Sequence, residues 1–125
     1  MPFERFTETG RGFAPKASIA RSGMIGLNSG AVRRYEVDKH PYCVLYYDSD
    51  TRRIGMELTD DADAPGARMI RLGRAGGAFI GARSFLEYYD ITPPATMLYP
   101  VGHDDEAKLL VLDLKLGRAR KTTKR

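Results

Sequence analysis

An internal repeat is the feature that most constrains how this chain folds. Residues 23–37 (GMIGLNSGAVRRYEV) align without gaps to residues 77–91 (GAFIGARSFLEYYDI), 54 positions later. The matched pairs are Gly23 with Gly77, Ile25 with Phe79, Val32 with Leu86, Tyr35 with Tyr89, Glu36 with Asp90 and Val37 with Ile91. With two extra residues in the second copy, residues 54–58 fall on residues 110–114. Self-similarity on this scale predicts a fold built from two similar units.

Each copy contains the same series of short elements. In the first copy, residues 19–27 predict two strands around a tight turn at Ser22-Gly23, and Asn28 or Ser29 can cap a short helix over residues 30–35. Residues 42–47 and 53–58 then predict a β-hairpin. In the second copy we expect the strands at 68–80, the helix at 83–89, and the hairpin at 96–101 and 109–116, with its turn at 102–106. The fold class is therefore mainly β with short helices, which must pack on the sheet to be stable.

The boundaries between these segments give the domain organisation. We expect an N-terminal arm at 1–18, a first repeat at 19–58, an acidic linker at 59–67, a second repeat at 68–116 and a basic tail at 117–125. A unit of about 40 residues is too small to bury its helix and both strand faces, so the two copies should share one core. The tail carries five basic residues and is expected to be disordered until it meets an anionic partner.

Charge alternates along the chain in step with the repeat, although the formal net charge is only +4. The net charges are +4 for residues 1–34, −5 for 35–67, +4 for 68–86, −4 for 87–116 and +5 for 117–125. We therefore expect folding to gather the basic segments on one face and the acidic segments on another, a distribution that suits a polyanionic partner. The alternative is that these charges only keep the surface soluble.

Several classes of protein are excluded or disfavoured. No apolar run approaches the ~20 residues of a membrane helix, and charges interrupt the N-terminus where a secretory signal is apolar, so we expect a cytoplasmic protein without a membrane partner. Cys43 is the single cysteine, which excludes an internal disulfide, and it is expected to be a buried, inert thiol. Two histidines and one cysteine are too few for a dedicated zinc site without many carboxylates, and we expect no metal and no cofactor.

Enzyme motifs are also missing from the sequence. The glycines of residues 73–77 are not followed by the Lys-Ser or Lys-Thr of a phosphate-binding loop, so they predict a turn. His103 lies beside an acidic hairpin turn, and we interpret that segment as a solvated turn. No catalytic triad or paired carboxylates in a recognisable setting occur, so the protein is not expected to be an enzyme.

The order of strand, glycine turn, strand, short helix with adjacent arginines, and hairpin resembles the swapped-hairpin domain of the AbrB and MazE transcription factors. The resemblance rests on residues 19–28 (IARSGMIGLN), 32–37 (VRRYEV), 44–48 and 54–58, and is looser over 68–116. The family usually has proline in place of Asn28 and glycine in place of Glu36. Family members pair units from two chains, whereas the MraZ proteins carry two units in one chain. The resemblance therefore implies a tandem swapped-hairpin AbrB-like pseudo-dimer that binds DNA.

A DNA-binding face would draw on the basic strands and helix starts of both copies. The expected contacts are Lys16, Arg21, Asn28, Arg33 and Arg34 from the first copy, Arg68, Arg71, Arg74 and Arg83 from the second, and Arg118, Arg120 and Lys121 from the tail. The guanidinium of arginine can hold a phosphate with two hydrogen bonds or reach O6 and N7 of guanine. We therefore expect double-stranded DNA as the partner and a role as a transcriptional regulator or nucleoid-associated protein, with homo-oligomers left open.

Two other functions remain as alternatives. The first is a protein-interaction module, such as an antitoxin-like inhibitor or an accessory subunit of a larger assembly, which would use the acidic hairpins or the arm at 1–18. The second is an RNA or single-strand binder that stacks bases on exposed tyrosines.

Overall fold

The computed structural model describes residues 14–119 of the chain. The first half contains β1 (Lys16–Ile19), β2 (Met24–Leu27), α1 (Ser29–Tyr35), the short 3₁₀ helix η1 (Val37–Lys39), β3 (Tyr42–Asp48) and β4 (Arg53–Thr59). The second half contains β5 (Arg68–Leu72), β6 (Ala78–Gly81), α2 (Arg83–Tyr88), β7 (Met97–Asp104), β8 (Leu109–Asp113), the 3₁₀ helix η2 (Leu114–Leu116) and β9 (Arg118–Ala119). The prediction of a mainly β protein with short helices is therefore confirmed.

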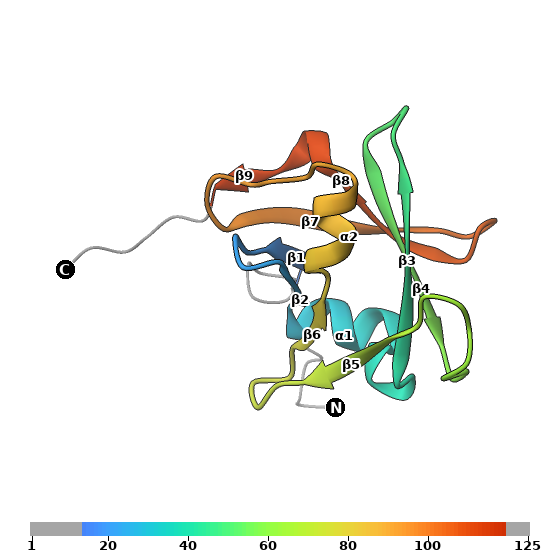
Figure 1. Ribbon diagram of the computed structural model, residues 1–125. Coiled ribbons are helices and arrows are strands. Elements are labelled where there is room, and N and C mark those ends of the chain that lie inside the picture. The colour runs from blue at the N-terminus through green and yellow to red at the C-terminus, as the bar shows by residue number, and fades with distance from the viewer. Residues whose placement is uncertain (1–13, 120–125) are drawn as a thin grey trace, which may run out of the picture.

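The strands form one closed barrel to which both halves contribute (Figure 1). Its order is β1-β2-β6-β5-β3-β4-β8-β7, and β7 pairs with β1 to close the ring of eight, while β9 adds to β7. The first strand of each half pairs with the hairpin of the other half, as β1 with β7 and β5 with β3. The pairs β2–β6 and β4–β8 also join the halves. If each strand is replaced by its counterpart in the other half, the same eight pairings result. An approximate two-fold axis therefore relates the two halves.

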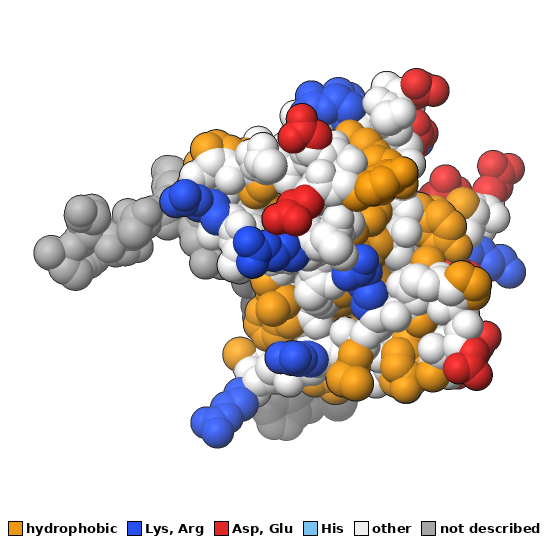
Figure 2. All heavy atoms as spheres, viewed as in Figure 1, with side chains coloured by type: hydrophobic (Ala, Val, Ile, Leu, Met, Phe, Trp, Pro, Cys, Tyr) orange, Lys and Arg blue, Asp and Glu red, His pale blue; other side chains and the backbone are white. Residues whose placement is uncertain are grey.

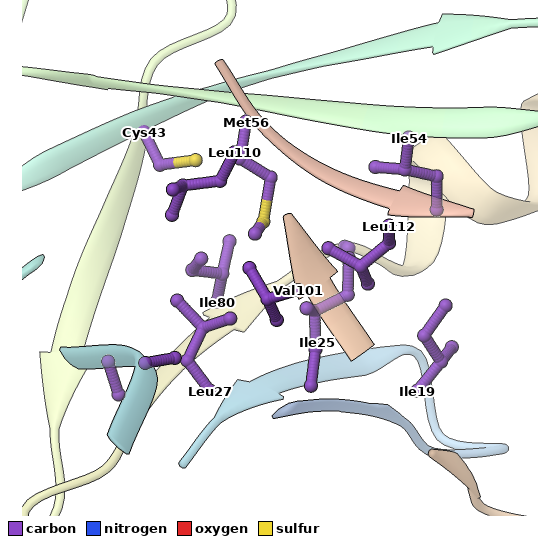
Figure 3. Close-up of a cluster of buried hydrophobic side chains, with 14 of the residues drawn as sticks. Ile19, Ile25, Leu27, Cys43, Ile54, Met56, Ile80, Val101, Leu110 and Leu112 are labelled. Carbon is purple, nitrogen blue, oxygen red and sulfur yellow. The ribbon is translucent and has the colours of Figure 1, made fainter. Parts of the chain in front are cut away.

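A single hydrophobic core fills the barrel (Figure 3). The close-up shows side chains from both halves pointing toward one another, among them Ile25, Leu27, Ile54, Ile80 and Leu112, each at most 2% exposed. Among the described residues no polar or charged side chain is buried. Because each half supplies only part of this core, the two halves stabilise each other.

The tight turns of the two halves are built alike. The matching backbone hydrogen bonds are Ala20 N to Met24 O with Gly73 N to Gly77 O, and Gly23 N to Ala20 O with Gly76 N to Gly73 O. Gly23 and Gly76 both adopt the left-handed conformation, with φ of 95° and 91°. Equivalent residues of the two turns are thus 53 positions apart, which places Arg21 and Arg74 at the same position of each turn.

The expected gapless alignment at 54 positions is therefore wrong in the strands. It matched Ile25 with Phe79, but Ile25 is fully buried whereas Phe79 is 41% exposed. Ile25 pairs across the ladder with Ile80, which is also buried. Because successive side chains of a strand point to opposite faces, an error of one residue exchanges inside for outside.

In the helices and hairpins the alignment agrees with the structure. Glu36 and Asp90, 54 positions apart, both lie at helix C-termini in the left-handed conformation, with φ of 55° and 58°. The hairpin tips match at 56 positions, because Asp48 and Asp104 each accept hydrogen bonds from two backbone N–H groups of their turn. One extra residue before α2 therefore separates the strand alignment from the helix alignment. That the halves arose by duplication stays a prediction.

Several expected boundaries differ from the structure. Residues 114–116, expected in the second hairpin, form η2, and Thr59, expected in the linker, is the last residue of β4. β1 begins at Lys16, so the boundary between arm and first repeat at residues 18 and 19 divides a strand. β7 continues to Asp104 instead of ending at residue 101, because its last residues pair with β8. Arg118 and Ala119, expected in a disordered tail, form β9 by pairing with Leu98 and Met97 of β7. The rest of the tail and most of the arm lie outside the described residues.

Candidate nucleic-acid interface

Asn28 has a structural role at the start of α1. Its Oδ1 accepts hydrogen bonds from the backbone N of Ala31, at 2.9 Å, and of Lys16, at 3.0 Å, and its Nδ2 donates to Ala14 O at 2.8 Å. The predicted helix cap is therefore confirmed, and the same amide also fixes β1. These bonds use the side-chain oxygen and one N–H of Asn28 within the fold, and its contact with DNA stays a prediction that would depend on the second amide N–H.

Replacing Asn28 by alanine should destabilise the protein by about 2–3 kcal/mol. The change removes a helix cap worth about 1 kcal/mol and two further hydrogen bonds worth roughly 1 kcal/mol each. Chemical denaturation followed by circular dichroism measures this loss. If stability were unchanged and only duplex affinity fell, Asn28 would be a DNA contact instead of a structural cap.

Each tight turn packs against the start of the other half's helix. The backbone N of Ala82 donates to Gly23 O at 2.8 Å, and a Cβ on Gly23 would lie 2.7 Å from the Cα of Arg83. In the same way, a Cβ on Gly76 would lie 3.2 Å from the Cβ of Ser29. The two turns are thereby held by the barrel, and their arginines extend from rigid positions.

The outer face between the turns is formed by β1, β2, β6 and β5. A row of cross-strand partners crosses it, consisting of Ser18, Gly26, Phe79 and Arg71. The approximate two-fold axis passes through the Gly26–Phe79 pair. Gly23 and Gly76 each lie three residues from this pair, in opposite directions along the β2–β6 ladder. The turns are therefore about 20 Å apart, six residues at roughly 3.3 Å each.

A groove of about 590 Å³ lies on this face between β1, the start of α1 and the β5–β6 turn. Leu27 and Phe79 contribute to an apolar lining, Lys16 and Arg74 are its cations, and no acidic residue of the described chain lines it. Phe79 is not among the site residues expected from the sequence. Burial alternates along β6, with Phe79 and Gly81 outward. No pattern in the sequence indicates this, because Ala78, Phe79 and Ile80 are all apolar.

The structure brings only some of the expected site residues to this face. Arg21, Arg71 and Arg74 are exposed there, and Lys16 is half-buried at its edge. Arg68 donates from Nη1 to Gly81 O at 2.8 Å, so part of its guanidinium is used within the fold.

The remaining arginines lie elsewhere or are paired. Arg83 contacts Glu87 with Nε to Oε2 at 3.2 Å. Arg33 and Arg34 are exposed in the last turn of α1, and Arg118 is exposed on β9. Arg120 and Lys121 lie outside the described residues.

Charge is partly segregated on the surface (Figure 2). In this view many Lys and Arg side chains lie over the left and lower part, where Figure 1 places the two tight turns, and others lie at the top and at the right edge. Asp and Glu side chains lie mainly near the hairpin tips on the right, and a few lie close to α2. The basic turns and the acidic tips therefore project from different sides of the barrel.

An aromatic cluster lies at the end of α2. The ring centroid of Tyr89 is 4.8 Å from that of Tyr47, 4.9 Å from Tyr88 and 5.2 Å from Phe85. Tyr88 is 81% exposed, so this cluster offers aromatic surface beside the barrel.

The histidines contact single carboxylates. Nδ1 of His40 lies 2.8 Å from Asp60, and Nδ1 of His103 lies 2.6 Å from Asp105. Within residues 14–119 no group of three or more His, Cys, Asp or Glu side chains is arranged to hold a metal ion. The helices of that same range are too short and polar to cross a membrane.

Cys43 should be unreactive in the folded protein. Burial raises the pKa of its thiol to about 12, opposed by nearby Arg68 and assisted by Glu57. Because the thiolate is the nucleophile, a disulfide reagent at pH 8 should modify Cys43 slowly until guanidinium chloride unfolds the chain. The unfolded thiol loses its proton near pH 9 while the folded one keeps it, so this group makes stability fall as pH rises from about 9 to 12. Rapid modification of the native protein would contradict this placement.

Comparisons with protein-family models, with curated proteins and with solved structures found no significant match to this chain.

Proposed function

We propose that this protein binds double-stranded DNA through the face that carries the two tight turns, and acts as a transcriptional regulator or nucleoid-associated protein. One observation carries the proposal. Arg21 and Arg74 are exposed at the same position of two equivalent turns, about 20 Å apart, on a side away from the acidic hairpin tips. Two arginines carried by packed turns at this separation suit the regularly spaced phosphates and base edges of a duplex, in which 20 Å corresponds to about six base pairs.

Two further observations support an AbrB-like swapped-hairpin pseudo-dimer as the architecture. Each half's first strand pairs with the hairpin of the other half, which is the exchange that such a domain requires. Glu36 and Asp90 hold the left-handed conformation that favours glycine, and glycine is the residue that the family usually has at the position of Glu36.

The chemistry of the face divides into affinity and specificity. Arginines that contact phosphates release counterions, so the affinity for any duplex falls steeply with salt. An arginine that reaches O6 and N7 of guanine adds preference for a sequence. With phosphate contacts from Lys16, Arg21, Arg71 and Arg74, affinity should fall about a hundredfold between about 50 and 200 mM salt.

The experiment that tests the proposal is a titration of the full chain against labelled duplex DNA, single-stranded DNA and RNA of the same sequence at these two salt concentrations. Tight, salt-sensitive binding that prefers the duplex supports it. Absence of duplex binding below about 0.1 mM, weaker than ordinary non-specific binders, would overturn it.

A protein-interaction module is the second candidate function, and the aromatic cluster around Tyr89 favours it. Tyrosine is enriched at protein interfaces because it combines a large apolar area with a polar end. The Tyr88→Ser variant separates the two functions, because it changes no charge and Tyr88 is not one of the residues expected to contact DNA. If the duplex does not bind and Tyr88→Ser alone abolishes capture of a partner protein, the protein-interaction function replaces DNA binding.

A further inference from the structure

The approximate two-fold relates the two turn arginines but leaves most of their surroundings different. On the strands, where equivalent residues are 53 positions apart, Ser18 corresponds to Arg71 and Gly26 to Phe79. On the helices, where they are 54 positions apart, the exposed pair Arg33 and Arg34 corresponds to Glu87 and Tyr88. Among the basic residues expected to contact DNA and described by the structure, Arg21 and Arg74 form the one pair in which both halves carry a positive charge at equivalent positions.

Because of these differences, the other arginines of the two halves lie at unequal distances from the two-fold axis. In the second half, Arg71 stands directly opposite Phe79, one strand away from the centre of the face. In the first half its place is taken by uncharged Ser18, and the additional arginines lie in the last turn of α1. The matching helix of the second half instead holds Glu87 within 3.2 Å of Arg83, where the two charges offset each other.

The centre of the face is also unequal. At the Gly26–Phe79 pair, the aromatic ring of the second half covers the buried glycine of the first half, because a Cβ on Gly26 would lie 3.3 Å from the Phe79 ring. The groove of about 590 Å³ adjoins this pair on the side of β1 and α1. A duplex laid across the face therefore meets a different shape on each side.

A two-fold symmetric protein matches a palindromic site, because equivalent groups read equivalent base pairs in the two half-sites. We propose that this chain binds in one orientation to a non-palindromic duplex site, with Arg21 and Arg74 about six base pairs apart and different contacts outside them. This inference rests on the proposed DNA binding. The Arg71 side should contact the duplex close to the centre, and the α1 side should contact it farther out.

Orientation can be measured with a DNA-cleaving iron chelate attached to one turn at a time. Ser22 and Ala75 are exposed, equivalent turn residues beside the two arginines, and Cys43 is buried. We would prepare the full-length variants Ser22→Cys and Ala75→Cys, label each, and bind them to duplexes selected by the unmodified protein from a random pool. The unmodified protein treated with the same reagent is the control and should give no cleavage.

One-way binding predicts that the Ser22→Cys conjugate cuts one half of each selected duplex and that the Ala75→Cys conjugate cuts the other half. If both conjugates cut both halves equally, or if selection yields palindromes or no common sequence, the inference is overturned while DNA binding stands. If the protein binds no duplex at all, the proposed function itself fails. The outcomes therefore distinguish the two.

A charge-equalising variant tests the cause of the orientation. Glu87→Arg with Tyr88→Arg gives α2 the two arginines of α1, and it should reduce the orientation preference and steepen the dependence of log affinity on log salt by about two. The matched control, Glu106→Arg with Ala107→Arg, makes the same charge change at the exposed β7–β8 tip. If the control reduced the orientation preference as much as the α2 variant, the helices would not be its source.

Discussion

Replacing Arg21 and Arg74 together by alanine is expected to weaken duplex binding about a thousandfold while the fold remains intact. Both side chains are exposed, so their removal costs the protein little stability. Each guanidinium that contacts a phosphate or a guanine contributes about 2 kcal/mol, or roughly thirtyfold in affinity, and the two contacts are far enough apart to add. Fluorescence anisotropy with a labelled duplex measures the affinity, and circular dichroism verifies the fold.

A matched control removes the same charge from another part of the barrel. Arg53→Ala with Lys115→Ala changes two exposed basic residues of β4 and η2. This variant should lose less than about threefold in affinity, because exposed charges beyond a Debye length of about 8–10 Å are screened. Equal losses in both double variants would show that net charge, and not the turns, governs binding.

The largest expected effect on stability follows from Gly23→Ala, which should lower the free energy of unfolding by about 3 kcal/mol. With φ at 95°, an alanine at this position is strained by about 1–2 kcal/mol. Its Cβ would also lie 2.6 Å from the Cβ and 2.7 Å from the Cα of Arg83, and backbone cannot move aside cheaply. Thermal unfolding should show a midpoint about 10 °C lower.

Gly81→Ala and Gly102→Ala are the controls for this effect. A Cβ at either position would meet no heavy atom within 4 Å, and neither residue has the left-handed φ of Gly23. Alanine should therefore leave stability unchanged or raise it by up to about 1 kcal/mol, because it restricts the unfolded chain. If Gly23→Ala had the same midpoint of thermal unfolding as these controls, the turn would not have the tight packing described above.

The sequence was sufficient to predict those elements whose local chemistry is specific. Asn28 marked the start of α1 because few side chains can accept from the first free backbone N–H groups of a helix. The hairpin tips were recognisable from Asp48, which bonds its own turn. By contrast, β9 has only two residues, Arg118 and Ala119, and its pairing with β7 depends on a contact that no local pattern reveals.

The candidate site was predicted less well. The reason is that equivalent residues of the two halves are 53 positions apart in the strands but 54 positions apart in the helices. Matching Gly23 to Gly77 would have aligned Arg21 with Ala75 and hidden the equivalence of Arg21 and Arg74. The hydrogen bonds of the two turns were needed to identify it. Composition alone could not show that Arg68 is partly used inside the fold, because tertiary structure brings its partner Gly81 near. The Arg83–Glu87 contact is an i,i+4 pair within one helix, which the sequence pattern could have indicated.

The closure of the barrel determines the order in which the chain can fold. β1 completes its pairing only with β7, whose residues 97–104 follow it by about 80 positions. During synthesis β1 and β2 therefore leave the ribosome long before β7 exists, and the free edge of β1 stays unpaired until β7 is made. Such high contact order makes folding slow and exposes the nascent chain to aggregation. If the chain were cut in the acidic loop after β4, each fragment should remain unfolded until it binds the other.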